Sequence, residues 1–257
     1  MNLFNKVKAL LFIFLLLSIT SCSGWKESER KKAALANEAC DPIYRQSNEK
    51  FYVLQTPRQI PRTAYPWEKQ MTGNLPRITK EYFRCRGSNA NLPYVHRQGE
   101  RGESLLIDCE GGLRHQLPLL NQKEHVPEIF IELLNYVQEK TGKRVHITCG
   151  HRCSRHNSYA DPRKDNYSSK HLTGHEVDFY VEGMEKNPQQ VVKIIESYYA
   201  SKGKKELTTF QRWQKPVNVA TQPWYNKEIF IKLYLVNEGR DRDNAHGYPY
   251  LSIQLRS

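Results

Sequence analysis

Hydrophobic and polar positions alternate along the chain in patterns that predict both helices and strands. Residues 126–143 have hydrophobic side chains along one side of a helix, and Gly142 is a suitable C-terminal cap. Asn187-Pro188 marks a second helix start, because Asn is a favoured N-cap and Pro is tolerated at the first helical position. Strands are predicted over residues 144–149, 230–236 and 248–256. This mixture predicts an α+β fold in which helices flank a small antiparallel sheet.

The N-terminus has the three-part pattern of a secretory signal. Lys6 and Lys8 precede an apolar run over residues 9–17, and small or polar residues follow. The run ends in Ile-Thr-Ser-Cys22, which resembles a bacterial lipobox, in which the Cys is lipidated and becomes the first residue. An ordinary signal peptide with a Cys nearby is the alternative. We expect a signal peptide over residues 1–21 and a lipid on Cys22 that attaches the protein to a membrane without spanning it.

Composition changes along the remainder of the chain. Residues 22–39 are charged and Ala-rich, which predicts a lipidated tether. Residues 40–125 form a less regular N-terminal segment of unknown role. In its first part, residues 40–110, prolines lie among aromatic and basic residues, which predicts short strands and loops without candidate chemistry. Residues 126–257 contain the helix and strand patterns and are the predicted functional domain.

The net charge narrows the choice of partner. The chain has 257 residues and a formal net charge of +12, which indicates an anionic partner such as nucleic acid, lipid or an acidic polymer. Removal of residues 1–21 leaves 37 basic against 27 acidic residues, a net charge of +10. Because this charge belongs to an exported protein, we expect no nucleic-acid partner.

Five cysteines follow Cys22 in the sequence. Export permits disulfides, but an odd number leaves at least one thiol without an intrachain partner. Cys149 and Cys153 are close in sequence, yet a structural zinc site there needs two more ligands. The neighbouring His151 and His156 match no zinc-finger spacing. We therefore expect these cysteines to be buried or in disulfides.

Candidate chemistry is concentrated in one histidine-rich stretch. Ser169-Lys-His171-Leu-Thr-Gly174-His-Glu-Val-Asp178 contains a His and an Asp seven residues apart. Gly174 permits a turn that brings the two side chains together. Imidazole nitrogen and carboxylate oxygen are both zinc ligands, and a catalytic zinc needs a third protein ligand from elsewhere in the chain.

This stretch resembles the Ser-x-His-x-x-Gly-x-x-x-Asp signature of the zinc D-alanyl-D-alanine carboxypeptidases and dipeptidases, which are related to lysostaphin-type peptidases and to the hedgehog fold. Upstream, Gly150-His-Arg152-Cys-Ser-Arg-His156-Asn resembles the family's Gly-Tyr-Arg-x-x-x-His-Asn element. Downstream, Asp243-Asn-Ala-His246 has the spacing of its C-terminal acid-x-x-His motif. The resemblance covers residues 126–256 and implies a zinc site on the sheet.

The resemblance also implies a role for each matched residue. The zinc ligands would be His171, Asp178 and His246. Asp243 would accept the proton of the attacking water, and Arg152 would stabilise the oxyanion or bind the substrate's carboxylate. Ser169 would orient the substrate or a ligand. The implied protein is a lipid-anchored zinc metallopeptidase of the cell envelope that hydrolyses peptidoglycan stem peptides, as a D-alanyl-D-alanine carboxypeptidase.

Two departures from the family pattern leave an alternative open. Some relatives end in a strand that reads His-x-Asp, and the same alignment here places Ser252 and Gln254 at those positions, where neither binds zinc nor acts as a base. In that register the protein is an inactive relative that binds peptidoglycan or has a structural role. Glu176 stands where many relatives have a small residue, and on a strand it would point the same way as Asp178.

Overall fold

The computed structural model describes residues 62–92, 109, 111–112, 115–160, 169–215, 217–239 and 241–256. The predicted signal peptide, the tether and Cys22 lie outside the described residues, as does Cys40. Within these ranges, no helix is both long enough and apolar enough to cross a membrane.

Six strands form an antiparallel sheet in the order β5-β6-β10-β9-β8-β7. The long strands are β5 (Val145–Cys149), β6 (Glu176–Val181), β9 (Ile229–Tyr234) and β10 (Tyr250–Leu255), and the short ones are β7 (Gln211–Arg212) and β8 (Trp224–Tyr225). The C-terminal strand β10 lies between β6 and β9, in the middle of the sheet. The prediction of mixed helices and antiparallel strands is confirmed.

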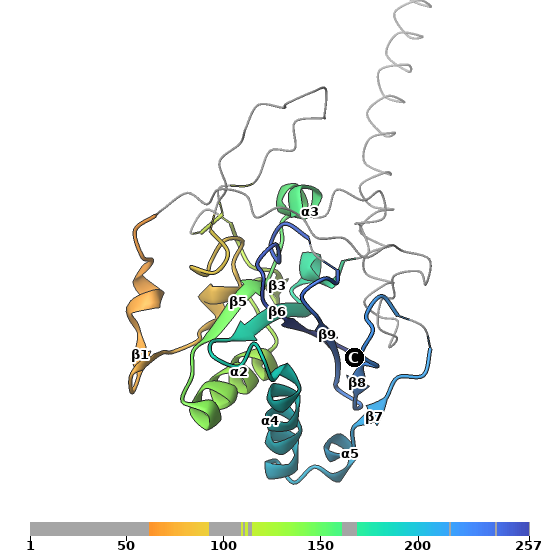
Figure 1. Cartoon of the computed structure of the whole chain (residues 1–257). Coiled ribbons are helices and arrows are strands. Elements are labelled where there is room, and N and C mark those ends of the chain that lie inside the picture. The colour runs from red at the N-terminus through yellow and green to blue at the C-terminus, as the bar shows by residue number, and fades with distance from the viewer. Residues whose placement is uncertain are drawn as a thin grey trace, which may run out of the picture. The chain divides into compact units, whose positions relative to one another are not determined.

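Two long helices, α2 (Glu128–Thr141) and α4 (Pro188–Ser201), pack against each other and cover one face of the sheet (Figure 1). Gly142 ends α2 in the left-handed conformation (φ 61°), and its N–H donates to the carbonyl of Gln138. Asn187 occupies the N-cap position of α4, although its side chain makes no capping hydrogen bond. The shorter helices are α3 (Ser154–Ala160) and α5 (Lys205–Thr208).

The two faces of the sheet differ in polarity because side chains alternate along each strand. Val177 and Phe179 of β6 belong to the same hydrophobic core as Phe130 of α2 and Ile195 of α4. The alternate positions of β6, β9 and β10 are polar yet buried, namely Glu176, Asp178, Lys232, Ser252 and Gln254. The sheet therefore has a hydrophobic face toward the helices and a buried polar row on the other face.

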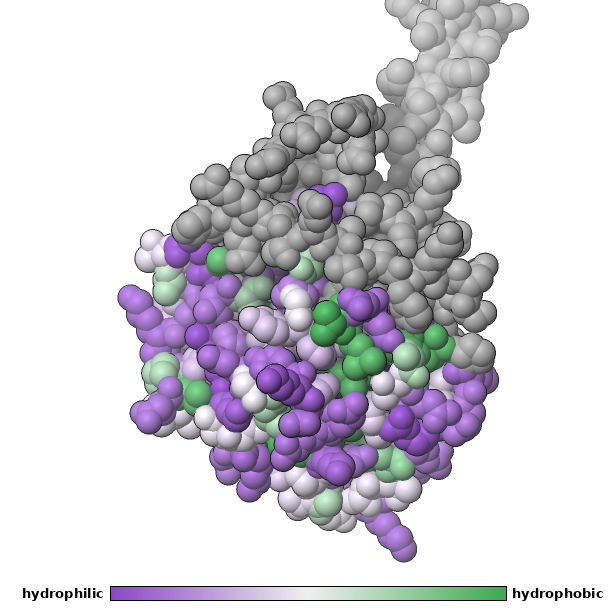
Figure 2. Space-filling view, viewed as in Figure 1, coloured by the Kyte–Doolittle hydropathy of each residue, from purple (hydrophilic) through white to green (hydrophobic). Residues whose placement is uncertain are grey.

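The N-terminal segment contributes to the same core. It contains two 3₁₀ turns, η1 (Pro66–Lys69) and η2 (Lys80–Phe83), and the short hairpin of β1 (Met71–Thr72) and β2 (Leu75–Pro76). A second hairpin, β3 (Leu119–Leu120) and β4 (Lys123–Glu124), precedes α2. Trp67 and Phe83 join the core cluster, and Gln138 of α2 donates to the carbonyl of Pro76 at 2.8 Å. The face drawn in Figure 2 is mostly hydrophilic, with smaller hydrophobic areas.

Replacement of Phe83 by Ala tests whether this segment is part of the core. Phe83 is 1% exposed, and its carbonyl accepts the N–H of His151 at 2.6 Å. We expect Phe83→Ala to lower the free energy of unfolding by about 3–5 kcal/mol, since it leaves a large cavity. Met71→Ala, at a position 52% exposed, is the control and should change it by no more than about 0.5 kcal/mol. Urea denaturation that shows equal effects for the two variants would contradict the assignment.

Candidate metal site on the polar face of the sheet

His171 lies in a short 3₁₀ turn, η5 (Lys170–Thr173), directly before β6. Ser169 is the N-cap residue of this turn and Gly174 ends it in the left-handed conformation (φ 73°), as expected for a tight reversal. The ring Nδ1 of His171 bonds to the carbonyl of Gly150 at 2.7 Å, and Arg152 N–H donates to the carbonyl of His171 at 3.0 Å. These bonds fix the ring so that Nε2 faces the polar row of the sheet.

Two carboxylates face Nε2 of His171. Asp178 Oδ2 is 3.3 Å away and Glu176 Oε2 is 3.7 Å away, and all three side chains are buried. Because Nδ1 must donate its proton to the Gly150 carbonyl, a neutral imidazole would direct a lone pair at two negative charges. The arrangement therefore favours a positive charge at this point, which either a second proton on His171 or a bound cation would supply.

The same requirement determines the ionisation of these groups. Burial by itself would lower the pKa of His171, but Cys149, Glu176 and Asp178 outweigh it and hold that pKa well above its usual range. Burial would likewise raise the pKa of Glu176, but His171 and Lys232 hold it below the usual carboxyl value. The charge distribution on this face thus favours a cation beside the two carboxylates.

The residues present fit a zinc ion. Imidazole and carboxylate are zinc ligands, and the carbonyl that holds Nδ1 is the kind of outer contact that orients a ligating His. Asp178 Oδ1 is buried and has no hydrogen-bond partner within the described part of the chain. Glu176 Oε1 accepts hydrogen bonds from Ser252 Oγ (2.7 Å) and Gln254 Nε2 (2.8 Å), and this leaves Oε2 toward His171. Among the described residues, ligand atoms of Cys149, His171 and Asp178 lie within 4.8 Å of one another.

In the Asp243-Asn-Ala-His246 motif, the residue that contacts this site is Asn244, which was not among the predicted site residues. Asn244 Nδ2 donates to Asp178 Oδ2 at 2.8 Å, and Asn244 Oδ1 accepts from Thr148 at 2.6 Å. The ring of His246 packs 5.1 Å from the ring of Tyr180. Within the described residues, the structure brings His171 and Asp178 together as predicted, and the group of ligand atoms around them does not include His246.

Asp243 lies instead in a buried cluster of charges. Its carboxylate binds Arg86 at 2.6 Å, Arg152 at 2.8 Å and His156 at 2.8 Å, and Arg152 also binds Asp241 at 2.6 Å. Burial would raise the pKa of Asp243, but His156, Arg152 and Arg86 hold it well below the usual range. Arg152 is 2% exposed, and it donates from Nε to Asp243 and from Nη2 to Asp241.

Ser252 and Gln254, which the alternative register aligns with the His-x-Asp strand of some relatives, lie on β10. On β10, Ser252 lies directly opposite Asp178 and Gln254 opposite Glu176. Both side chains bond to Glu176. In the alternative register, a hydroxyl and an amide that bond to Glu176 would therefore stand where a His-x-Asp strand has its zinc ligand and acid.

Sequence reasoning did not find Arg86, Asn244 or the Gly150 carbonyl. Asn244 lies inside the acid-x-x-His motif, between the candidate residues Asp243 and His246. A polar amide at that position was the signal that could have identified it. Arg86 gave no local signal, because its partner Asp243 is 157 positions away. The carbonyl of Gly150 is a backbone group, which no residue pattern identifies.

Residues 115–215 match the Peptidase M15 family model. The match confirms the resemblance to the zinc D-alanyl-D-alanine peptidases, and it supports a zinc peptidase. The M15 region covers less than half of the chain. It includes Arg152, His171 and Asp178 and ends before Asp243, His246 and Ser252. Comparisons with curated proteins and with solved structures gave no significant match.

Replacement of Asp243 by Asn tests the buried charge cluster. We expect a loss of about 3–5 kcal/mol in unfolding free energy at neutral pH, since two buried arginines lose their shared anion. The folded-state pKa of Asp243 is lowered, so its stabilising effect is present above the ordinary carboxyl pKa of about 4 and is lost as pH falls through the folded value.

The deficit of Asp243→Asn should therefore be largest near neutral pH and shrink in acid, as measured by urea denaturation across a pH series. Glu139→Gln, on an exposed side chain, is the control and should change little. A deficit that did not depend on pH would show that Asp243 does not act through its charge.

Proposed function

We propose that this protein is a zinc peptidase of the cell envelope that hydrolyses peptidoglycan stem peptides, with D-alanyl-D-alanine carboxypeptidase activity as the specific reaction. The observation that carries the proposal is the pair His171 Nε2 and Asp178 Oδ2, 3.3 Å apart and both buried, within a segment that matches the M15 peptidases. The carbonyl that fixes Nδ1 of His171 and the unpartnered Asp178 Oδ1 support it.

The proposed ligands are His171 and Asp178, with Glu176 in place of the third ligand that His246 was expected to supply. Among the described residues, the third side chain whose ligand atom lies within 4.8 Å of both is Cys149, so Glu176 would have to move toward Asp178 to bind the same ion. The Oε2 atom of Glu176 lies 3.7 Å from Nε2 of His171, close to the separation of about 3.3 Å between ligand atoms around a tetrahedral zinc. When bound, zinc supplies the Lewis-acid chemistry that polarises a peptide carbonyl. Ser252 and Gln254 hold Glu176 in place, and Asn244 holds Asp178.

The proposed location rests on the sequence. The lipobox at Cys22 supports attachment to a membrane, and the net charge of +10 after signal removal supports approach to anionic lipids and cell-wall carboxylates. The proposed partners are peptidoglycan peptides, which are the substrates of the enzymes that the sequence resembles, and a membrane, which the lipid would contact.

One observation favours a second candidate function. Ser252 and Gln254 lie opposite Asp178 and Glu176, where active relatives with a C-terminal His-x-Asp strand have a zinc ligand and an acid. Asp243, the predicted base, is held by two arginines. Both features support an inactive relative that binds peptidoglycan without cleaving it.

Zinc content and cleavage of a pentapeptide that ends in D-Ala-D-Ala distinguish the two functions. We expect the wild type to release D-Ala, and His171→Ala to lose one equivalent of zinc and at least a hundredfold in cleavage rate. His175→Ala, which removes a nearby His that bonds to Thr173, is the matched control and should keep both.

The peptidase proposal fails if the wild type releases no D-Ala or if His171→Ala keeps the full rate. Binding of the wild type to purified cell-wall sacculi without cleavage would support the inactive relative. A wild type that neither cleaves the pentapeptide nor binds sacculi would leave only a structural role.

The predicted lipid is tested separately. Cys22→Ser should move the protein from the membrane fraction to the soluble fraction and abolish incorporation of a labelled fatty acid, because the acylated residue is absent. Cys40→Ser is the control, because it also removes a thiol downstream of the predicted cleavage site, and it should leave the protein in the membrane fraction. Equal fractionation of Cys22→Ser and wild type would contradict lipidation.

A further inference from the structure

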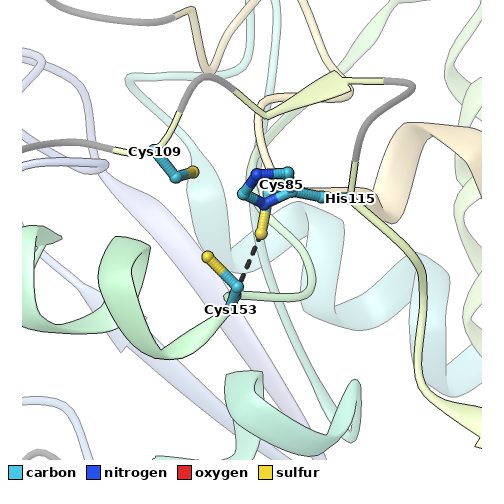
Figure 3. Close-up of side chains that lie close together, drawn as sticks. All are labelled: Cys85, Cys109, His115 and Cys153. Atoms are coloured by element: carbon cyan, nitrogen blue, oxygen red, sulfur yellow. Dashed lines mark hydrogen bonds between the residues drawn. The ribbon is translucent and has the colours of Figure 1, made fainter.

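A second group of candidate ligands lies outside the site described above. Cys85, Cys109, His115 and Cys153 each direct a ligand atom toward the same point, and these atoms all lie within 4.8 Å of one another (Figure 3). We propose that this Cys₃His cluster binds a structural zinc ion that links three distant segments of the chain. The proposal is independent of the proposed peptidase activity.

The donor set and its geometry suit zinc. Three thiolates and one imidazole are a recognised ligand set of structural zinc sites. At bond lengths of about 2.3 Å to sulfur and about 2.0 Å to nitrogen, tetrahedral ligand atoms are about 3.5–3.8 Å apart. Cys85 and Cys109 are 0% and 2% exposed, and Cys153 and His115 are partly buried, so all four protein ligands are present and largely shielded from water.

Hydrogen bonds that involve the backbone hold three of the four residues in position, namely Cys85, Cys153 and His115. The N–H of Cys153 donates to Cys85 Sγ at 2.9 Å, and the N–H of His156 donates to Cys153 Sγ at 3.4 Å. Hydrogen bonds of this kind orient metal ligands and stabilise negative sulfur. The carbonyl of His115 accepts from Arg84 at 3.1 Å, which fixes the backbone of the fourth ligand.

The turn after Cys109 is adapted to close approach. Gly111 has φ +62°, and a Cβ there would collide with the carbonyl of Cys85 and the side chain of Arg86. The N–H of Gly112 donates to the carbonyl of Cys85 at 2.6 Å. Gly111 and Gly112 thus lie directly against the backbone of Cys85.

A single disulfide accounts for the cluster less well than a metal does. It would join two sulfurs and leave the third, together with the imidazole, without a role. All three cysteines are free thiols in the structure. Zinc uses all four groups, and its binding releases the thiol protons to solvent.

A zinc ion in this cluster would also stabilise the buried charge cluster around Asp243. Cys85 precedes Arg86, and Cys153 follows Arg152, and these are the two arginines that bind Asp243. Asn244, next to Asp243, holds Asp178. A metal bound by Cys85 and Cys153 would therefore fix both arginines and, through Asp243 and Asn244, one side of the first site.

The experiment measures zinc per chain in the purified full-length protein and in His171→Ala, which removes the first site. We expect His171→Ala to retain about one zinc, and Cys109→Ser in that background to lose it. Cobalt(II) added to apo His171→Ala should give an intense thiolate-to-cobalt charge-transfer band, which reports sulfur ligation without any assay of activity. Cys149→Ser in the same background should keep this band, because Cys149 lies outside the cluster.

His115 provides a test that loss of folding cannot explain. His115→Ala should weaken zinc affinity at least tenfold in a competition with a chelator, and His115→Cys should restore it, since Cys₄ is also a zinc ligand set. The proposal is overturned if His171→Ala holds no zinc and gives no cobalt band, or if mass spectrometry of the exported wild type finds two of the three cysteines joined in a disulfide. Zinc that is lost only with His171 would uphold the first site and reject this one.

Discussion

Buried charge on the polar face of the sheet is the constraint on which the site depends. Asp178 and Glu176 lie on one strand and face the same imidazole, far from bulk water. Two buried carboxylates are stable only if a cation or a set of hydrogen bonds compensates them. The structure supplies hydrogen bonds from Ser252, Gln254 and Asn244, and it leaves the point beside His171 for a positive charge.

The second charge cluster supports the first through a single loop. Residues 241–246 contain Asp243, which binds both arginines, and Asn244, which binds Asp178. One turn therefore connects the Arg86–Arg152 pair to the polar face of the sheet. The Cys₃His cluster lies at the residues adjoining both arginines, so the N-terminal segment, the upstream Gly150–Arg152 element and the final loop form one connected unit.

Much of the fold could be predicted from the sequence because its signals are local. Helix α2 and its Gly142 cap, the start of α4 at Pro188, and the strands β5, β9 and β10 follow from hydrophobic periodicity and capping residues. The reading of residues 40–110 as loops without candidate chemistry did not find Cys85, whose sulfur accepts the N–H of Cys153 in the M15 region, or Arg86, which binds Asp243. Their partners are far away in the sequence, and no local pattern encodes such a contact.

The His171–Asp178 pair could be predicted from local sequence, because a turn of fixed length joins the two residues and Gly174 makes that turn possible. Local sequence also determined that Glu176 shares a face with Asp178, since alternation along a strand is a local rule. Which residue of the Asp243–His246 loop contacts the candidate metal site depends on long-range packing, and that residue is Asn244. Spacing fixes the length of a loop, but the packing of that loop against Arg86, Arg152 and Tyr180 decides the direction of each side chain.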